Sequence, residues 1–277
     1  MGDTVTLDRL GGVAILAINR PERMNAINAA TGELLERGFV EAATDPTVRV
    51  IVLTGAGDRA FCAGADAERL QDLSGAAAPA RQLRAPGEPS VLDVFETSPP
   101  GIRTRYTLPL LTPKPVIAAI NGACAGVGLA LAVACDIRFA SSTAAFASAF
   151  ARRGLTAEAG LAWTLPRLVG HGAAADILLS ARKFGADEAH AMGLVNRVEE
   201  PAALLPAAMA YAKDLTENCS PRSLRTIKQQ LSASASQSIE AAMALSWEFM
   251  LTSLESADFR EGVDAFRDGR KPTFSGE

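Results

Sequence analysis

The stretch that most constrains the fold covers residues 114–140 and reads KPVIAAINGACAGVGLALAVACDIRFA. Its pattern predicts a buried strand at Val116–Ile120, a break at Asn121-Gly122, a glycine-bearing turn over residues 125–128, and then a buried helix. A strand that passes through a glycine turn into a helix start aims backbone N–H groups at a ligand oxygen or anion. The stretch therefore predicts a ligand-binding turn inside the core.

The same stretch is long and apolar enough to be compared with a membrane-spanning helix, because residues 115–135 are apolar apart from Asn121. Its Gly and Ala content and the Asn-Gly break favour a buried strand–turn–helix over a membrane-spanning helix. The N-terminus has no basic region followed by an apolar core, so we expect no secretory signal and a cytoplasmic protein without membrane partners.

The composition fits one large α/β domain, or one domain with an extension. With 277 residues, 48% of them hydrophobic, the chain can bury a sizeable core. The formal net charge of −4 and the 5% content of aromatic residues argue against a nucleic-acid partner, which would need a basic stripe or a stacking platform.

Cysteine and histidine usage indicates neither a metal site nor a catalytic triad. The two histidines, His171 and His190, cannot supply a His-rich site, and surface roles suit both. No CxxC pair occurs, so we expect reduced, structural thiols at the four cysteines, Cys62, Cys124, Cys135 and Cys219.

Strand and helix patterns alternate along the first 200 residues. A Gly11-Gly12 turn separates the first two strands, and helical spacing covers residues 25–43. This rhythm indicates an α/β fold with crossover helices. The predicted strands are Val5–Leu10 and residues 13–19, 48–54, 116–120, 136–140 and 195–198.

The remaining segments differ in character. Residues 74–105 are rich in Ala, Pro, Gly and charge without strong periodicity, which is typical of a lid or binding loop. After residue 204 the strand patterns stop, and a helical extension suited to oligomer contacts follows. Its predicted helices are residues 207–215 and 221–233, Ile239–Leu254 and Ala257–Asp268.

Two glycine turns follow buried strands, at residues 60–66 (AFCAGAD) and 122–128 (GACAGVG). The second lacks the third glycine of a dinucleotide fingerprint, and neither a phosphate-binding GxxxxGK[ST] loop nor a GxSxG nucleophile elbow occurs. Two separate turns that present backbone N–H groups suit an oxyanion hole, in which paired donors stabilise charge on a carbonyl oxygen.

Six segments, in order along nearly the whole chain, resemble the crotonase superfamily of enoyl-CoA hydratases and isomerases. They are Asn19-Arg20-Pro21 with Met24-Asn25-Ala26, AFCAGADAERL (residues 60–70), the stretch 114–140, GLTAEAGLAWTLPRLVG (154–170), ARKFGADEAHAMGLVNRV (181–198) and the tail FREGVDAFRDGRKPTF.

The resemblance implies an α/β spiral of repeated ββα units over residues 1–200 and a helical region over residues 201–277 that forms a homotrimer or a hexamer. It also implies an acyl-CoA substrate and no cofactor apart from the coenzyme A of that substrate. The thioester oxygen would lie between the backbone N–H groups of Ala65 and Val127. The family has glycine at the second position, but valine can still donate if the turn does not require a positive φ there.

The resemblance further implies a set of contacts with CoA. For Asp66 the alternative is a helix-start carboxylate that favours the dipole. The implied contacts are Arg23, Ala26, Ala63, Asp66, Ala67 and, near the adenine end, Phe266.

The chain departs from the hydratase pattern at the two catalytic glutamates. The matching positions hold Ala130 and Phe150, and neither side chain can transfer a proton. Hydration needs a base that activates the water and an acid that protonates the carbon. With alanine and phenylalanine at these positions, neither role is filled there.

Glu158 matches the place where some isomerases of the superfamily carry a single acidic residue. Isomerisation needs one carboxylate, which moves a proton from C2 to C4. The alternative is structural: Thr156 caps the helix that contains Trp163, and Glu158 favours its N-terminus. We expect Phe150 and Trp163 to line an apolar pocket, whose dryness would raise the pKa of Glu158.

The sequence thus predicts an enzyme that shifts a double bond from 3-enoyl-CoA to 2-enoyl-CoA. Two alternatives stay open: a hydratase with a different acid and base, and an acyl-CoA-binding homologue without catalysis. Acyl-chain length and pathway are beyond what the sequence predicts.

Overall fold

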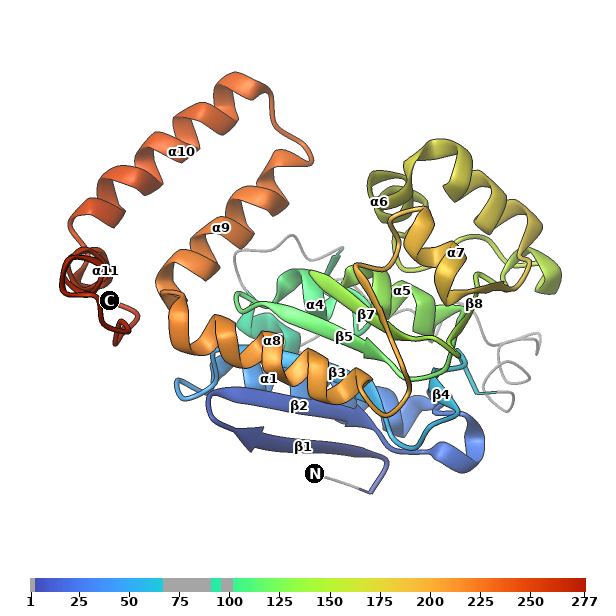
Figure 1. The fold of residues 1–277 in the computed structure, drawn as a ribbon. Coiled ribbons are helices and arrows are strands. Elements are labelled where there is room, and N and C mark those ends of the chain that lie inside the picture. The colour runs from blue at the N-terminus through green and yellow to red at the C-terminus, as the bar shows by residue number, and fades with distance from the viewer. Residues whose placement is uncertain (1–2, 67–90, 96–101) are drawn as a thin grey trace.

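A computed structural model describes residues 3–66, 91–95 and 102–277 of the chain (Figure 1). The described strands form two sheets. The larger has the order β1 (Val5–Leu10), β2 (Val13–Ile18), β3 (Val50–Gly55), β5 (Val116–Ile120), β7 (Ile137–Ser141), β10 (Arg197–Glu199). The smaller has the order β4 (Ala60–Cys62), β6 (Ala123–Ala125), β8 (Ala145–Ala147), β9 (Phe184–Gly185).

From β3 to β8, successive strands alternate between the two sheets, which is how the chain forms a spiral. The pairs β3–β4, β5–β6 and β7–β8 each place one strand in the larger sheet and the next in the smaller sheet. Among the described strands of the larger sheet, the neighbours β2, β3, β5, β7 and β10 run parallel, and the hairpin strand β1 runs antiparallel at the edge. The predicted α/β spiral of repeated ββα units is confirmed.

Helices pack around these sheets, and the last three extend away from them (Figure 1). They are α1 (Ala29–Thr44), α4 (Leu108–Leu111), α5 (Val127–Ala134), α6 (Leu161–Ala175), α7 (Ala186–Ala191), α8 (Leu204–Asn218), α9 (Pro221–Ser234), α10 (Ile239–Leu254) and α11 (Ala257–Asp268). No helix in the described part of the chain is both long enough and apolar enough to cross a membrane.

The central strands of the larger sheet, β3 and β5, are buried on both faces. On β3, Ile51 and Leu53 face the main core with α1 and α5, whereas Val50 and Val52 face the helix α8. Parallel strands covered on both sides need such an uninterrupted apolar run. Helix α8 packs on the sheet, so the first helix after residue 200 is part of the core layer.

Helix α1 begins later than the predicted residue 25. Met24 and Asn25 both have a left-handed backbone, with φ of 53° and 55°, and cannot start a helix. Asn28 is the N-cap instead, and its side chain accepts a hydrogen bond from the Thr31 amide at 2.9 Å.

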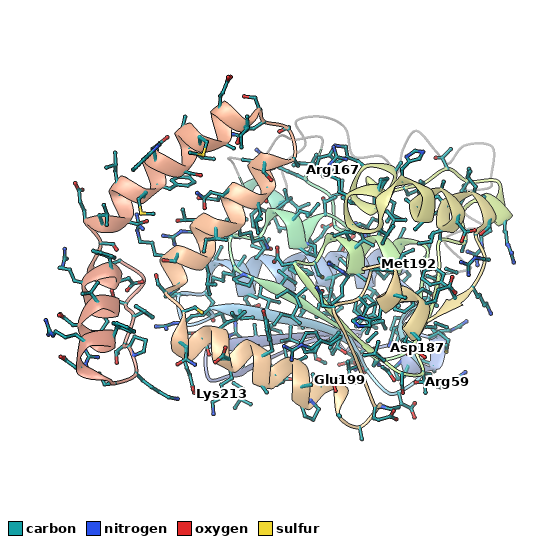
Figure 2. All side chains as sticks on the ribbon, turned by 45° about the horizontal axis from the view of Figure 1, so that its top comes forward. Arg59, Arg167, Asp187, Met192, Glu199 and Lys213 are labelled. Atoms are coloured by element: carbon teal, nitrogen blue, oxygen red, sulfur yellow. The ribbon has the colours of Figure 1, made fainter. Side chains whose placement is uncertain are left out.

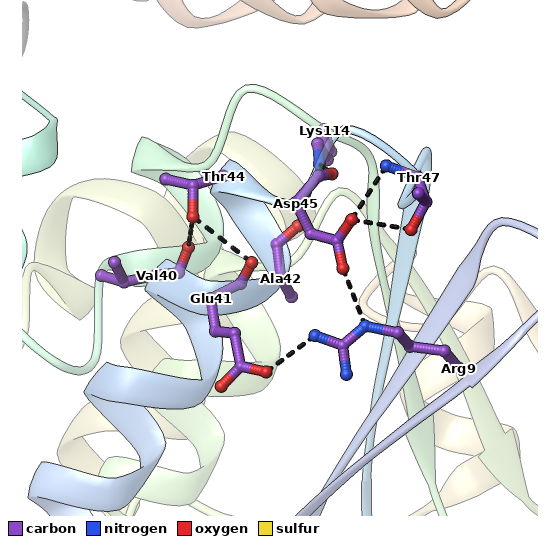
Figure 3. Close-up of polar contacts among 8 residues, drawn as sticks. All are labelled: Arg9, Val40, Glu41, Ala42, Thr44, Asp45, Thr47 and Lys114. Carbon is purple, nitrogen blue, oxygen red and sulfur yellow. Dashed lines mark hydrogen bonds and ion pairs between the residues drawn. The ribbon is translucent and has the colours of Figure 1, made fainter.

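The far end of α1 is tied to the β1–β2 hairpin and to Lys114 (Figure 3). The Arg9 guanidinium contacts Asp45 at 2.8 Å and Glu41 at 2.7 Å. Hydrogen bonds from Thr47, with the Arg9 guanidinium, lower the pKa of Asp45 to about 2. Lys114 Nζ donates to the Ala42 and Asp45 carbonyls, a cation at the negative end of the helix dipole. This cluster lies at the amino ends of β2 and β3.

Helices α9, α10 and α11 form an arm that leaves the core beside α8 (Figure 1). No residue of α10 is buried, and the only buried residue of α9 is Lys228, 7% exposed. Lys228 Nζ contacts Asp136 Oδ2 at 2.6 Å and donates to the carbonyls of Pro109 at 2.7 Å and Lys114 at 3.0 Å. Burial lowers the pKa of this amine, and Asp136 opposes the shift. Lys228 therefore fastens the arm to the core.

Replacing this amine should loosen that attachment. Lys228→Met removes the cation that pairs with Asp136 and the donor that serves two carbonyls, and removal of one partner of a buried pair costs about 3 kcal/mol. We expect the free energy of unfolding in urea to fall by that amount. The control is Lys213→Met at an exposed site on α8 (Figure 2), where we expect no change. Equal unfolding midpoints for the two variants would contradict the attachment.

Candidate functional site

The first glycine turn follows β4 and is held by Ile27. The Ile27 amide donates to the Gly64 carbonyl at 2.8 Å, and the Asp66 amide donates to the Ile27 carbonyl at 3.1 Å, which makes Ile27 and Ala65 a parallel bridge. Because backbone groups of successive extended residues point to opposite sides, the Ala65 N–H points away from Ile27. Within the described residues, this amide donates to no carbonyl.

The segment that carries Ile27 is itself fixed by a buried side chain. Asn25 accepts a hydrogen bond from the Arg20 amide at 2.9 Å and donates to the Ala60 carbonyl at 2.6 Å. The Ala63 amide in turn donates to the Met24 carbonyl at 3.0 Å. These bonds explain why Met24 and Asn25 are held in a left-handed conformation that costs free energy in an isolated peptide.

The second turn ends at the N-terminus of α5. Gly126 is the N-cap, with φ 54° and ψ −124°, and Val127 is the first helical residue. Val127 is not among the residues with positive φ. The turn therefore accepts a valine here, and its backbone N–H stays available as a donor. Its N–H belongs to the first turn, whose donors have no partner inside the helix. Among the described residues no side chain or loop carbonyl accepts it.

The two turns lie against each other. β4 and β6 are parallel neighbours, with Cys62 opposite Cys124. A Cβ atom on Gly64 would lie 3.1 Å from the Ala125 carbonyl oxygen, and one on Gly128 would lie 2.2 Å from the Cys62 carbonyl oxygen. Only glycine permits this approach. Ala65 and Val127 therefore lie on touching turns.

Asp66 has a partner within the protein. Its carboxylate contacts the Arg20 guanidinium at 2.8 Å, and the side chains of Asp66 and Arg20 are only 5% and 11% exposed. Three other predicted CoA contacts lie on the same two segments: Arg23 is exposed, Ala63 is half-buried and Ala26 is buried. Ala67 lies outside the described residues, as does most of the predicted binding loop 74–105.

The two positions that a hydratase fills with glutamate are apolar and buried here. Ala130 lies in the second turn of α5, and Phe150 follows the loop after β8; both belong to the main core. Neither position offers a proton donor or acceptor.

The predicted surroundings of Glu158 are wrong in two respects. Helix α6 begins at Leu161 with Gly160 as its N-cap, so Thr156 does not cap it. Ala159 and Gly160 have φ of 51° and 74°, which end any earlier helical start. Glu158 is exposed on this loop, and its carbonyl accepts the Leu161 amide at 3.0 Å. The expected dry environment is absent around it in the described structure.

Trp163 also differs from its expected place. It is 47% exposed on α6, and the guanidinium of Arg167 lies 3.8 Å above its ring. Phe150 is buried, so the two side chains do not jointly line an enclosed apolar pocket. Phe266 is 91% exposed on α11, which lies across the molecule from β4 and α5 (Figure 1). A single chain does not bring Phe266 to the turns.

Other reactive groups are few among the described residues. No group of three His, Cys, Asp or Glu side chains there could hold a metal ion. Cys62, Cys124 and Cys135 are buried free thiols, and burial raises the pKa of Cys62 and Cys135 to about 12. Thiols held neutral in this way are poor nucleophiles.

The chain is similar to many known proteins over its whole length. The sequence model of the enoyl-CoA hydratase/isomerase family matches residues 8–277. A Rhodobacter capsulatus protein named "Probable enoyl-CoA hydratase" is 38% identical over 99% of this chain and 98% of its own. The 1,2-epoxyphenylacetyl-CoA isomerase of Escherichia coli is 34% identical over 96% of each. The crystal structure of an enoyl-CoA hydratase from Bacillus anthracis superposes with a TM-score of 0.85, at 28% identity, over 99% of this chain and 100% of that one.

Proposed function

The chain belongs to the enoyl-CoA hydratase/isomerase family, and we propose that it shifts a double bond within an acyl-CoA, from 3-enoyl-CoA to 2-enoyl-CoA. The observation that carries this proposal is the pair of buried apolar residues, Ala130 and Phe150, at the positions of the hydratase glutamates. Water addition needs two proton-transfer groups at once, whereas a double-bond shift needs one.

We propose that the Ala65 and Val127 amides form the oxyanion hole. Removing a proton from C2 places negative charge on the thioester oxygen of the dienolate. Two donors on touching turns, one of them at the positive end of α5, would stabilise that charge. The close approach of Gly64 to the Ala125 carbonyl supports this assignment.

We propose that Glu158 carries the proton. It would accept the C2 proton as a carboxylate and return it to C4, so that the enzyme is regenerated without a further cofactor. Glu158 is the only acidic residue between residues 148 and 170, and the helix that follows it, α6, packs against α5. A base on an exposed loop acts only while the bound acyl chain brings C2 next to it.

A second candidate is hydration, because relatives at 34–38% identity are named hydratases. Hydration would need another residue to activate the water, because Ala130 and Phe150 cannot act as bases. A third is acyl-CoA binding without turnover, which the exposure of Glu158 favours.

One assay separates the three candidates. The purified protein is incubated in turn with a 3-enoyl-CoA and the matching 2-enoyl-CoA, and the acyl-CoA products are separated by chromatography. We expect 2-enoyl-CoA from the first substrate and no 3-hydroxyacyl-CoA from the second. Formation of 3-hydroxyacyl-CoA would instead support hydration, and binding of both without conversion would support a non-catalytic role.

We also propose self-assembly as a homotrimer or hexamer through the arm. Its helices expose many large apolar side chains that a single chain leaves in water, and such an exposed apolar surface is typical of an interaction site. On α10 these are Ile239, Met243, Trp247, Met250, Leu251 and Leu254, and on α11 they are Phe259, Val263 and Phe266.

A further inference from the structure

Arg20 and Asp66 form a buried ion pair directly behind the first glycine turn. Arg20 Nη1 contacts Asp66 Oδ2 at 2.8 Å and also donates to the Ala26 carbonyl at 2.6 Å. The guanidinium thus links the carboxylate to the segment that leads to Ile27. A planar guanidinium can hold two acceptors in fixed directions, which a lysine amine does less well.

The pair closes a ring of contacts around one backbone amide. Ile27 bonds to Gly64 and to Asp66, the two neighbours of Ala65, and Arg20 joins Asp66 to the same strand-like segment. The peptide plane that carries the Ala65 N–H is therefore held on both sides. Any slip of the turn along Ile27 would stretch the ion pair, and a buried charge without its partner is strongly unfavourable.

We propose that Arg20 and Asp66 are positioning residues, which aim the Ala65 N–H at the thioester oxygen and do not bind coenzyme A themselves. This rests on the proposed function, because it needs the acyl carbonyl to be the ligand of Ala65. It replaces the expectation that Asp66 contacts CoA, since its buried side chain faces a guanidinium inside the protein.

Positioning and direct CoA contact differ in which part of the ligand senses a mutation. A residue that acts through Ala65 affects only the interaction with the carbonyl oxygen. A residue that touches CoA affects every CoA derivative alike. An acyl-CoA thioester and the matching S-alkyl-CoA thioether, which lacks the oxygen, therefore separate the two roles.

The experiment measures the Kd of both ligands by calorimetry for wild type, Asp66→Asn and Arg20→Lys. We expect the wild-type protein to prefer the thioester by about 10-fold, the worth of one to two hydrogen bonds. Asp66→Asn should reduce this preference to about 2-fold and leave the thioether Kd unchanged. Arg20→Lys keeps the positive charge but loses the hydrogen bond to the Ala26 carbonyl. The thioester preference of this variant should therefore lie between these two values. With 3-enoyl-CoA, both variants should lower kcat and raise KM by about the factor by which the thioester Kd rises.

The matched control is Asp45→Asn, which breaks the Arg9–Asp45 pair at the opposite end of β2 and β3 (Figure 3). We expect wild-type preference and turnover from it. If Asp66→Asn does not fold, as judged by circular dichroism, Arg20→Lys carries the test.

The outcomes are distinct. If Asp66→Asn or Arg20→Lys weakens the binding of the thioester and the thioether equally, the residue contacts CoA, and the positioning role is wrong while the oxyanion hole stands. A thioester preference that stays at the wild-type value in these variants would likewise contradict the positioning role. A wild-type protein that does not distinguish the two ligands would overturn the oxyanion hole, and the inference with it.

Discussion

Glu158→Gln should lower kcat for the double-bond shift by about 10²- to 10⁴-fold, the usual contribution of a general acid–base group. The amide is nearly the same size as the carboxylate but cannot accept the C2 proton. KM should change little, because Glu158 lies on an exposed loop and its side chain makes no hydrogen bond or ion pair with any other described residue. Steady-state turnover of 3-enoyl-CoA measures the effect.

The control for this loss is Asp187→Asn, which removes an exposed carboxylate from α7 (Figure 2). It should leave kcat within about 2-fold, since surface substitutions are usually close to neutral. Unchanged turnover in Glu158→Gln would exclude Glu158 as the base. If hydration of 2-enoyl-CoA then persisted in the same variant, the hydratase candidate would replace the isomerase.

The sheet could be predicted from the sequence because its strands are covered on both faces. The run from Val48 to Thr54 has no polar side to place in water, and it forms β3 with Ile51 in one core and Val52 in the other. Helix α10 was predicted with its observed bounds, because its caps, Ser238 and Glu255, interrupt a strongly apolar run.

The three-residue strands of the smaller sheet could not be predicted in the same way. β4, β6 and β8 lie within Gly- and Ala-rich turns, where a period of two has no length over which to appear. The late start of α1 depends on the contacts of Asn25 with Ala60 and Ala56, which are more than 30 residues away. Such long-range bonds override local helix propensity.

In the candidate site, too, the local features could be predicted from the sequence and the long-range contacts could not. Each glycine turn was visible in the sequence, but their mutual contact comes from the pairing of β4 with β6. Local pattern also says little about exposure. Trp163 was expected in a pocket and lies half-exposed, and Asp66 was expected at the ligand and faces Arg20. A motif locates a region of the fold, whereas side-chain partners follow from segments that only the folded chain brings together.

Val127→Pro should lower kcat by about 10²- to 10³-fold, the cost of removing one oxyanion-hole donor. Proline removes the N–H and is well tolerated at the first position of a helix, where α9 already carries Pro221. The preceding residue, Gly126, has ψ of −124° and so lies outside the α region that proline disfavours in its neighbour. The backbone should therefore accept the ring.

Two variants separate loss of the donor from loss of structure. Val127→Ala keeps the N–H at the same place, and we expect its kcat to stay within about 3-fold of wild type. Ala257→Pro places the same ring at the first position of α11, away from the turns, and tests the tolerance of a helix start. If Val127→Pro and Val127→Ala have equal kcat, the amide of Val127 does not hold the thioester oxygen. If Val127→Pro is impaired, Val127→Ala is not, and the urea midpoints of Val127→Pro and Ala257→Pro are equal, the loss of activity comes from the missing N–H. Val127→Ala then excludes an effect of side-chain volume, and Ala257→Pro excludes an effect of helix stability.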